Sequence, residues 1–352
     1  MTNLADYPKS ELAEILKNEY SVPSYRAGQL YDGVTAFDRY DEMTTLPKKL
    51  KDQLSANYRD RALEIEKKLL SRDGTVKYLY RLSDGNIIEG AFMKQSYGNT
   101  LCVSTQVGCR MGCAFCASGI DGLIRNLTAG EILSQVLCVN RDAGGTKGKR
   151  AVTNIVLMGS GEPLDNYDEV TKFLRLLSAE KGLNMSLRNV SLSTCGLCDK
   201  IIELADSGLT VTLTISLHSP YDKRRSEIMP INNKYNVASV IEAAKYYLKK
   251  TGRRVIFEYS LIEGENCSVR DAEKLAELLR SMQCHVNLIR LNPVKERNLK
   301  GANKDSVKQF SDTLTQLGIS NTLRRSMGND IEGACGHLRN KFLEERNKRA
   351  DS

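Results

Sequence analysis

Between residues 100 and 318 the sequence alternates short apolar runs of β-prone residues with amphipathic helical stretches. The six runs lie at residues 101–104, 154–158, 190–193, 211–216, 255–259 and 286–290. Apolar side chains recur at helical spacing in the stretches between them, for example at residues 129–137, 167–177 and 268–279. Strands joined by helices run parallel, with right-handed connections. Six units are too few for a closed eight-unit barrel, so we expect an α/β fold with an open partial (βα)6 barrel.

A cluster of cysteines follows the first apolar run, in Cys109-Arg-Met-Gly-Cys113-Ala-Phe-Cys116. Thiolates at this density ligate soft metals, and structural zinc or iron-sulfur sites usually have four protein ligands. Three cysteines would leave one metal position open, as in a 4Fe-4S cubane whose fourth iron takes a small molecule as ligand. A zinc site completed by a distant His or Cys, or three ordinary thiols, are the alternatives.

Polar residues follow the other runs, at the strand ends where this architecture places its chemistry. Gly159-Ser-Gly161-Glu162-Pro163 comes after the second run, and its proline and missing third glycine argue against a dinucleotide-binding loop. The remaining candidates are Ser193 after the third run, Ser216, Leu217 and His218 after the fourth, and Asn292 after the sixth. Polar side chains that converge in this way suit a zwitterionic ligand with a ribose. Each of them alone is also compatible with an ordinary strand end.

The flanking segments predict three further units around a core at residues 95–330. Residues 1–60 read as a small helical accessory domain, with helices at 9–17, 24–31 and 46–54. Its candidate phosphate contacts are Arg26, Lys48, Lys49 and Lys51, and a solvated helix face is the alternative. Residues 61–94 favour an antiparallel β-ribbon, because Asp73-Gly74 and Asp84-Gly85 are turn dipeptides. Residues 331–352 form a loop with Cys335 and a charged tail.

Composition limits the classes of function. Its 352 residues are enough for one large α/β domain with an accessory piece. We find no signal peptide and no apolar run that spans a bilayer, so we expect a soluble, cytoplasmic protein without a membrane partner. Ten cysteines then suit a reducing compartment, where clustered thiols more often bind metal than form disulfides. The net charge of +8 permits a polyanionic partner such as nucleic acid.

The cysteine spacing, with an aromatic residue before the last cysteine, resembles the signature of the radical S-adenosylmethionine (SAM) superfamily. Six further features make the chain similar to the RlmN/Cfr family of RNA adenosine methyltransferases, over almost its whole length. They are Arg125-Asn126-Leu127, Gly161-Glu162-Pro163-Leu164, Ser216-Leu217-His218, Met229-Pro230-Ile231-Asn232, Asn287-Leu288-Ile289 and Gly328-Asn-Asp330-Ile-Glu-Gly-Ala334-Cys335-Gly336. The Pro163 motif is typical of the branch that methylates carbon 2 of adenine, and the carbon-8 branch is the alternative.

The resemblance implies a set of cofactors and roles. Cys109, Cys113 and Cys116 would hold one 4Fe-4S cluster, and its open iron would bind SAM, of which each turnover uses two. The residues that would contact SAM are Gly161, Glu162, Ser193, Ser216, Leu217, His218 and Asn292. Cys335 would accept a methyl group as a thiolate nucleophile and pass it to the base through a covalent intermediate. Glu89 would be the proton acceptor, and Cys102 would release the product by forming a disulfide with Cys335.

Some of these residues have ordinary alternatives. Glu89 could be an exposed strand carboxylate, and Cys102 or Cys335 an inert thiol. His337 stands where the resemblance leads us to expect glutamine, which bears on RNA contacts and leaves the thiol chemistry unchanged. Cys195 and Cys198 make an additional C-x2-C pair, which we expect to be free thiols. Cys138, Cys267 and Cys284 read as packing residues.

By resemblance, the substrates are an adenosine near the peptidyl-transferase centre of 23S rRNA and adenosine 37 of tRNA, and a flavodoxin or ferredoxin supplies the electron. Such RNA is recognised by shape and by bases turned out of the stack. Two rivals from other classes are a non-catalytic zinc module that binds RNA and a radical SAM activase that makes a glycyl radical on a protein.

Overall fold

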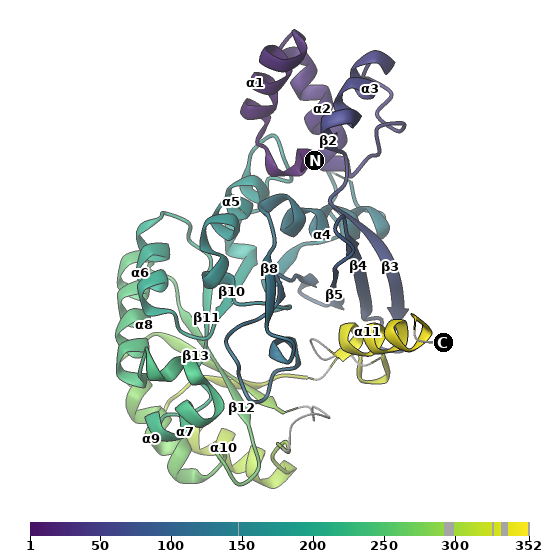
Figure 1. Ribbon diagram of the computed structural model, residues 1–352. Helices are drawn as coiled ribbons and strands as arrows, with labels where there is room; N and C mark the ends of the chain where they lie inside the picture. The colour runs from purple at the N-terminus through teal and green to yellow at the C-terminus, as the bar shows by residue number, and fades with distance from the viewer. Residues whose placement is uncertain (147, 292–298, 326, 332–336, 351–352) are drawn as a thin grey trace.

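An open sheet of ten strands runs through the molecule in the order β14-β13-β12-β11-β10-β9-β6-β5-β4-β3. The computed structural model describes all residues except 147, 292–298, 326, 332–336 and 351–352 (Figure 1). The strands are β3 (Leu63–Leu70), β4 (Val76–Leu82), β5 (Ile87–Gln95), β6 (Gly98–Cys102), β9 (Asn154–Leu157), β10 (Val190–Thr194), β11 (Thr212–Ser216), β12 (Val255–Leu261), β13 (Cys284–Arg290) and β14 (Asn321–Leu323). Across the described residues the edge strands β14 and β3 do not pair, so the predicted open sheet is confirmed.

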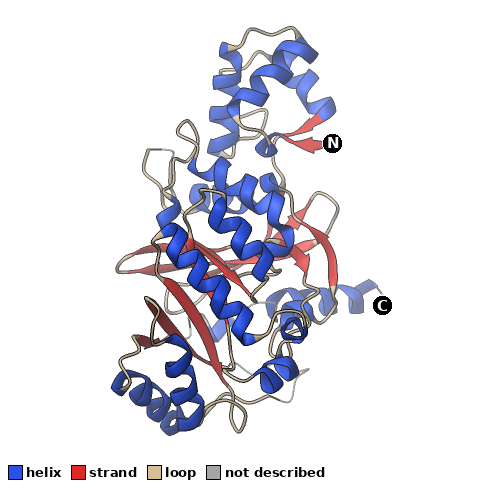
Figure 2. Ribbon diagram, turned by 90° about the vertical axis from the view of Figure 1, so that its left-hand side faces the viewer, coloured by secondary structure: helices blue, strands red, loops and turns tan. Residues whose placement is uncertain are grey.

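Seven neighbouring strands of this sheet, β6 and β9 to β14, are parallel. Six of them are the predicted runs, and β14 is an addition that the sequence pattern missed because it has only three residues. The connecting helices are α4 (Ala129–Asp142), α5 (Tyr167–Ser178), α6 (Cys198–Asp206), α7 (Asp222–Ile228), α8 (Val237–Thr251), α9 (Val269–Leu279) and α10 (Lys304–Gln316). Figure 2 shows helices covering the outer side of the strands. No helix in the described ranges is long and apolar enough to cross a bilayer.

The two faces of the sheet differ in chemistry because side chains alternate along each strand. On the helix-covered face, Leu101, Ile155, Leu192, Ile215 and Phe257 are completely buried in one apolar core. The opposite, concave face carries the residues between them. The register aligns Cys102 with Val156, Val156 with Ser191, Ser193 with Thr214, and Ser216 with Glu258 on this face. Alternation therefore brings polar residues from strands far apart in sequence onto one surface.

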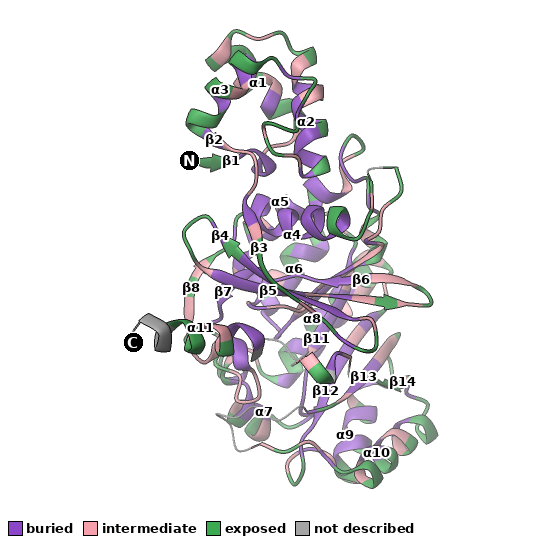
Figure 3. Ribbon diagram, turned by 90° about the vertical axis from the view of Figure 1, so that its right-hand side faces the viewer, coloured by how far each residue is buried: buried purple, intermediate pink, exposed green. Residues whose placement is uncertain are grey.

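The predicted ribbon is present as β3, β4 and β5, with Gly74 and Gly85 at positive φ in its two turns. It is not a separate extension, because β5 pairs antiparallel with β6 and so continues the main sheet. Tyr78 and Tyr80 of β4 pack into the main core, and the Tyr78 hydroxyl donates to Asp142 Oδ2 at 2.7 Å. The other face of the ribbon is covered by α11 (His337–Ala350), whose Leu338 joins a small cluster with Leu79 and Ile87 (Figure 3).

The amino-terminal helices form their own small core. They are α1 (Lys9–Tyr20), α2 (Tyr25–Ala36) and α3 (Lys48–Asn57), close to the three predicted helices, with Pro47 at the N-cap of α3 and not inside its first turn. A short parallel pair of β1 (Thr2–Asn3) and β2 (Tyr58–Arg59) closes this unit. Leu12, Leu16, Leu30 and Leu54 fill its core. In Figure 1 the unit lies above α4 and α5, at the top of the view.

A buried carboxylate fastens this unit to the main domain. Asp6, in the 3-10 turn Leu4–Asp6, accepts a hydrogen bond from the Gly130 backbone N–H at 2.6 Å. Gly130 lies in the first turn of α4, where backbone N–H groups lack partners within the helix and favour negative charge. A methyl group on Gly130 would come within 2.7 Å of the Asp6 backbone nitrogen, so only glycine allows this approach.

Replacing Asp6 by alanine should therefore weaken the whole molecule. The variant leaves a buried helix N–H without its acceptor, which should lower the free energy of unfolding by about 1–3 kcal/mol. Urea unfolding of the full-length chain measures this loss. Asp52→Ala, at an exposed position of α3, is the control and should change stability by less than about 0.5 kcal/mol. Equal effects of the two changes would contradict the assigned contact.

Candidate active site

The three clustered cysteines lie on a loop between β7 (Gln106–Gly108) and β8 (Leu123–Asn126), which pair as a separate small hairpin. Cys109 is buried, and Cys113 and Cys116 are half-buried. The loop is held over the end of β11, because the Phe115 ring meets the His218 ring edge-on at 4.6 Å between centroids. The Ala114 N–H also donates to the Ile228 carbonyl at 2.9 Å. This loop therefore sits across the carboxyl ends of the parallel strands.

The three thiols act on one another electrostatically. Burial, together with the charges of Cys116 and Glu162, raises the pKa of Cys109 to about 12. Burial also raises the pKa of Cys113, again with contributions from Cys116 and Cys109. Within the described residues no three His, Cys, Asp or Glu side chains already stand as a complete metal site. The fit to a soft metal cluster therefore rests on three thiols of one loop whose charges act on one another, since a metal stabilises thiolates that burial alone disfavours.

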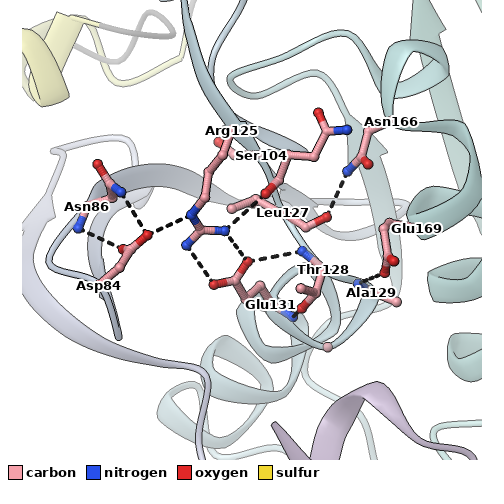
Figure 4. A network of polar contacts seen from close by, with 12 residues as sticks. Asp84, Asn86, Ser104, Arg125, Leu127, Thr128, Ala129, Glu131, Asn166 and Glu169 are labelled. Atoms are coloured by element: carbon pink, nitrogen blue, oxygen red, sulfur yellow. Dashed lines mark hydrogen bonds and ion pairs between the residues drawn. The ribbon is translucent and has the colours of Figure 1, made fainter. Parts of the chain in front are cut away.

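The hairpin that carries this loop is fixed at its far end by a polar network (Figure 4). Arg125 of β8 donates to both carboxylate oxygens of Glu131, at 2.7 and 2.9 Å, and to Asp84 of the ribbon at 2.6 Å. Although burial opposes it, hydrogen bonds from Arg125 and Asn86 lower the pKa of Asp84 to about 2. The predicted motif Arg125-Asn126-Leu127 thus ties the hairpin to the ribbon and to the start of α4.

The glycine-rich segment after β9 packs tightly against the segment that follows β6. Gly161 has φ +110°, and a methyl group there would lie 2.7 Å from Gln106 Cβ and 2.8 Å from the Gln106 nitrogen. A methyl group on Gly159 would lie 2.7 Å from the Val103 carbonyl oxygen. Both positions therefore require glycine. The Gln106 side chain in turn accepts from the Glu162 N–H at 2.9 Å.

Glu162 joins the end of β9 to the end of β10. Its buried carboxylate accepts from the Cys195 N–H at 2.7 Å and the Leu164 N–H at 3.0 Å. Burial raises the pKa of Glu162 in spite of these hydrogen bonds. Ser193, two residues before Cys195, is half-buried on the concave face. The Glu162 carboxylate therefore lies near enough to the cysteine loop for its charge to act on Cys109 and Cys113.

His218 holds an unusual backbone position after β11. Its φ is +57°, its Nδ1 accepts from the Ser260 N–H at 2.9 Å, and its carbonyl accepts from Asn266 at 2.6 Å. Burial, with the Arg225 charge, lowers the pKa of His218 to about 3, so the ring is neutral with its hydrogen on Nε2. The hydrogen bond to Ser260 therefore holds the His218 ring in place against the Phe115 ring. Leu217 is fully buried and Ser216 half-buried beside it.

A buried arginine that no sequence pattern indicated lies at the centre of this arrangement. Arg225 of α7 has no exposed surface and donates to the carbonyls of Cys195 and Leu217 at 2.7 and 3.0 Å. It also donates to Asn232 Oδ1 at 2.9 Å, and Asn232 belongs to the Met229-Pro230-Ile231-Asn232 motif. This guanidinium fastens the ends of β10 and β11 to each other. The motif could have pointed to Asn232, but nothing in the sequence marked its partner.

A cavity of about 1110 Å³ opens on the concave face of the sheet. Cys102 lines it, 7% exposed at the end of β6. Deeper in, the buried Glu258 accepts from Asn287 at 3.0 Å and pairs with Arg324 at 3.3 Å. Five cationic side chains contribute to the lining: Lys94, Arg188, Arg290, Arg324 and Arg325. Sequence reasoning missed this basic rim, because its members come from four separate segments.

Glu89 lies on β5, the third strand of the ribbon, as predicted, but it is 2% exposed and so is not a surface carboxylate. It faces the same side of the sheet as Ala91, which pairs with Cys102 of β6. Its Oε1 lies 3.4 Å from Lys77 Nζ, and its Oε2 accepts from the Arg339 N–H at 3.1 Å. Arg339 follows Cys335 by four positions in the sequence.

Cys335 and Asn292 lie outside the described residues, and for His337 only the helical backbone is described. The residues on both sides of Cys335 contact the ribbon. Before it, the Gly328 N–H donates to Asp73 at 2.8 Å, and Asp330 accepts from the Arg72 N–H at 3.0 Å. After it, Arg339 contacts Glu89 as described above. The chain therefore leaves and rejoins the ribbon around the predicted nucleophile.

The remaining cysteines match their predictions. Cys195 and Cys198 are buried free thiols, which confirms that they do not form a disulfide. Cys138 is buried in the main core, and Cys267 and Cys284 pack against it. Among the amino-terminal candidates for phosphate contact, Lys48 and Lys49 are exposed, whereas Arg26 donates to Gln29 at 2.7 Å.

Comparison with known proteins places this geometry in context. Residues 103–279 match the Radical SAM superfamily. A protein of Clostridium botulinum (strain Alaska E43 / Type E3) named "Probable dual-specificity RNA methyltransferase RlmN" is 48% identical over 353 residues, which cover 100% of both chains. A protein of Clostridium perfringens (strain 13 / Type A) with the same name is also 48% identical, over 98% of this chain and 99% of its own. The crystal structure of a radical SAM methyltransferase from Sphaerobacter thermophilus superposes with a TM-score of 0.91, at 42% identity, over 96% of this chain and 98% of that one.

The packing of Gly161 leads to a stability prediction. Gly161→Ala should lower the free energy of unfolding much more than Gly252→Ala, although both residues have positive φ. Gly252 has open space around the added methyl group, so its change should cost about 1 kcal/mol of backbone strain alone. At Gly161 the methyl group also meets the Gln106 backbone, which cannot move aside without disturbing the site. Similar urea-unfolding losses for the two variants would refute this account of the loop.

Proposed function

Because the chain belongs to the RlmN family within the radical SAM superfamily, we propose that it methylates carbon 2 of adenosine in 23S rRNA and in tRNA. Membership makes it a SAM-dependent radical RNA methyltransferase that uses a 4Fe-4S cluster and SAM. The observation that carries the finer proposal is the concave cavity, which brings Cys102 of β6 beside the strand that holds Glu89. The methylated adenine would lie in this cavity.

The cofactors are assigned to the strand ends. Cys109, Cys113 and Cys116 would hold the cluster, which, when bound, supplies the electron that cleaves SAM. The residues that would surround SAM are Gly161, Glu162, Ser193, Ser216, Leu217, His218 and Asn292. Within this group, Glu162 and Arg225 fix the backbone at the ends of β9, β10 and β11, so the chain binds the ligand with groups already held in place.

Three side chains would carry the methyl group and the proton. The Cys335 thiolate would accept the methyl group of one SAM, and the radical that cleavage of a second SAM supplies would remove one hydrogen atom from it, so that this carbon joins carbon 2 of the base. The unpaired electron left on the ring would return to the cluster, and Glu89 takes the hydrogen of carbon 2 as a proton while the electron pair of that C–H bond stays on the ring. The Cys102 thiolate then forms a disulfide with the Cys335 sulfur. The bond between Cys335 and the transferred carbon breaks, and that carbon keeps the electron pair of the bond and takes up a proton to become the methyl group. An electron-poor ring carbon with an inert C–H bond makes ordinary nucleophilic attack on SAM ineffective, which is why a covalent route is used.

The proposed domain roles follow from these positions. Residues 1–60 would contact RNA together with the basic rim of the cavity, residues 61–94 would present Glu89, residues 95–330 would form the radical SAM core, and residues 331–352 would carry Cys335. We assign the electron-donor role to a flavodoxin or ferredoxin and the location to the cytoplasm. The target adenine would leave its stack to reach the cavity floor.

The proposed reaction predicts a trapped intermediate. After anaerobic reconstitution with iron and sulfide, the wild-type protein should convert SAM and an rRNA or tRNA fragment into RNA that contains 2-methyladenosine, which mass spectrometry distinguishes from 8-methyladenosine. Cys102→Ala should instead accumulate a covalent protein-RNA adduct, visible on a denaturing gel, because release of the RNA needs the second thiol.

The matched control is Cys138→Ala, which removes a buried thiol of α4 and should turn over normally. Normal turnover of Cys102→Ala would refute the role of that thiol, and a colourless, zinc-containing protein that leaves SAM intact would favour the RNA-binding module.

The basic rim predicts a salt-dependent loss of RNA affinity. Lys94→Gln and Arg188→Gln each remove an exposed cation from the cavity lining, so each should weaken RNA binding in low salt. The slope of log K against log salt should fall by about 0.7 per variant if the RNA is single-stranded at the contact. Lys308→Gln, an exposed lysine on α10, is the control and should leave both affinity and slope unchanged. Fluorescence titration with a labelled RNA fragment at several salt concentrations measures both; an unchanged slope for both rim variants would contradict their contact with phosphate.

A further inference from the structure

A lysine buried inside the ribbon pairs with Glu89. Lys77 lies on β4 and is 1% exposed, and its Nζ is 3.4 Å from Glu89 Oε1. The register pairs Lys77 with Ala91 and Leu79 with Glu89, so the lysine and the carboxylate are diagonal neighbours on one face of two antiparallel strands. Lysine is almost never fully buried without a partner, because removing its charge from water is costly.

Among the described residues, apolar side chains lie next to this pair. Leu79 and Ile87 are on the same face of the ribbon, and Leu338 of α11 packs against them. Replacing a buried ion pair by apolar residues is often neutral or stabilising, so stability alone does not account for a charged pair at this position.

Two different elements hold the two oxygens of the Glu89 carboxylate. Lys77 of β4 approaches Oε1, and the backbone N–H of Arg339, in the first turn of α11, donates to Oε2 at 3.1 Å. The Arg339 side chain is turned elsewhere, to the Ile87 carbonyl at 2.9 Å and to Asp121 at 3.5 Å. In the described part of the chain, the charged or titratable groups that face Glu89 from the elements packed against it include Lys77 from β4, Arg339 from α11 and, one strand along, Cys102 from β6.

We infer that Lys77 is a positioning residue that holds the Glu89 carboxylate on the sheet face that it shares with Cys102, where it serves as the base for the adenine ring. This inference rests on the proposed function, in which Glu89 accepts the proton of carbon 2. The ammonium group neutralises the carboxylate before the transfer and does not itself exchange a proton. The C–H bond of the ring carbon breaks, its electron pair stays on the ring, and the proton ends on Glu89.

A single-turnover experiment tests the inference with the full-length, cluster-loaded protein and an RNA fragment. Lys77→Met should load iron and cleave SAM as the wild type does, because neither process needs the base. Formation of the covalent protein-RNA adduct should also continue. Its conversion to methylated RNA should slow roughly tenfold or more, because the Glu89 carboxylate without its ammonium partner is no longer held in position.

Rescue by the conservative variant separates this role from a structural one. Lys77→Arg keeps a cation and should restore adduct release to within a few-fold of the wild type, whereas Lys77→Met should not. The double variant Lys77→Met/Glu89→Gln should be no slower than Glu89→Gln alone, because both changes act on one step.

Arg81→Met is the matched control. Arg81 lies on the same face of β4 but pairs with Glu66 at 2.8 Å and is mostly exposed, so its loss should change none of these rates. Release of the adduct at the wild-type rate by Lys77→Met would overturn the inference, and so would a loss that Lys77→Arg does not restore. If Lys77→Met fails to load iron, Lys77→Gln is judged by the same comparison. If the wild type itself yields no methylated adenosine, the proposed function fails first.

Discussion

The register of the sheet is the constraint on which the rest of the molecule depends. Side chains alternate along a strand, and hydrogen bonding fixes which residues stand side by side, so one choice of pairing decides both faces of all ten strands at once. The pairing found here places Leu101 and Ile155 under the helices and leaves Cys102 and Val156 on the concave face. A slip of one residue in β6 would put the predicted resolving thiol into the apolar core.

Much of this architecture could be predicted from the sequence, because hydrophobic periodicity and turn dipeptides are local signals. The six parallel strands, the ribbon and the amino-terminal helices all appear near their expected positions. The joining of β5 to β6 could not be predicted in the same way, since pairing between neighbouring units depends on contacts across the whole sheet. Strand β14 is too short to show a period.

Some residues of the candidate site could likewise be predicted from the sequence, and others could not. Cysteines and glycines could be selected from sequence because their chemistry and spacing are distinctive. Arg225 and Lys77 could not, because an isolated arginine or lysine in a polar stretch usually lies on the surface. Only the fold reveals that Arg225 is fully buried and satisfies three acceptors from separate elements. The cost of burying such charges means that each one has to be paired, and the pairs define the geometry of the site.

The ribbon connects the two halves of the proposed chemistry. Through β5 and β6 it continues the sheet whose strand ends carry the cysteine loop and the glycine-rich segment. Through Asp73, Arg72 and Glu89 it also binds the chain on both sides of Cys335. Glu89 belongs to both sets of contacts, because it shares a sheet face with Cys102 and accepts a hydrogen bond from the first turn of α11. Docking of α11 and orientation of the proposed base are therefore one event, so any change that loosens this helix should also disturb the carboxylate.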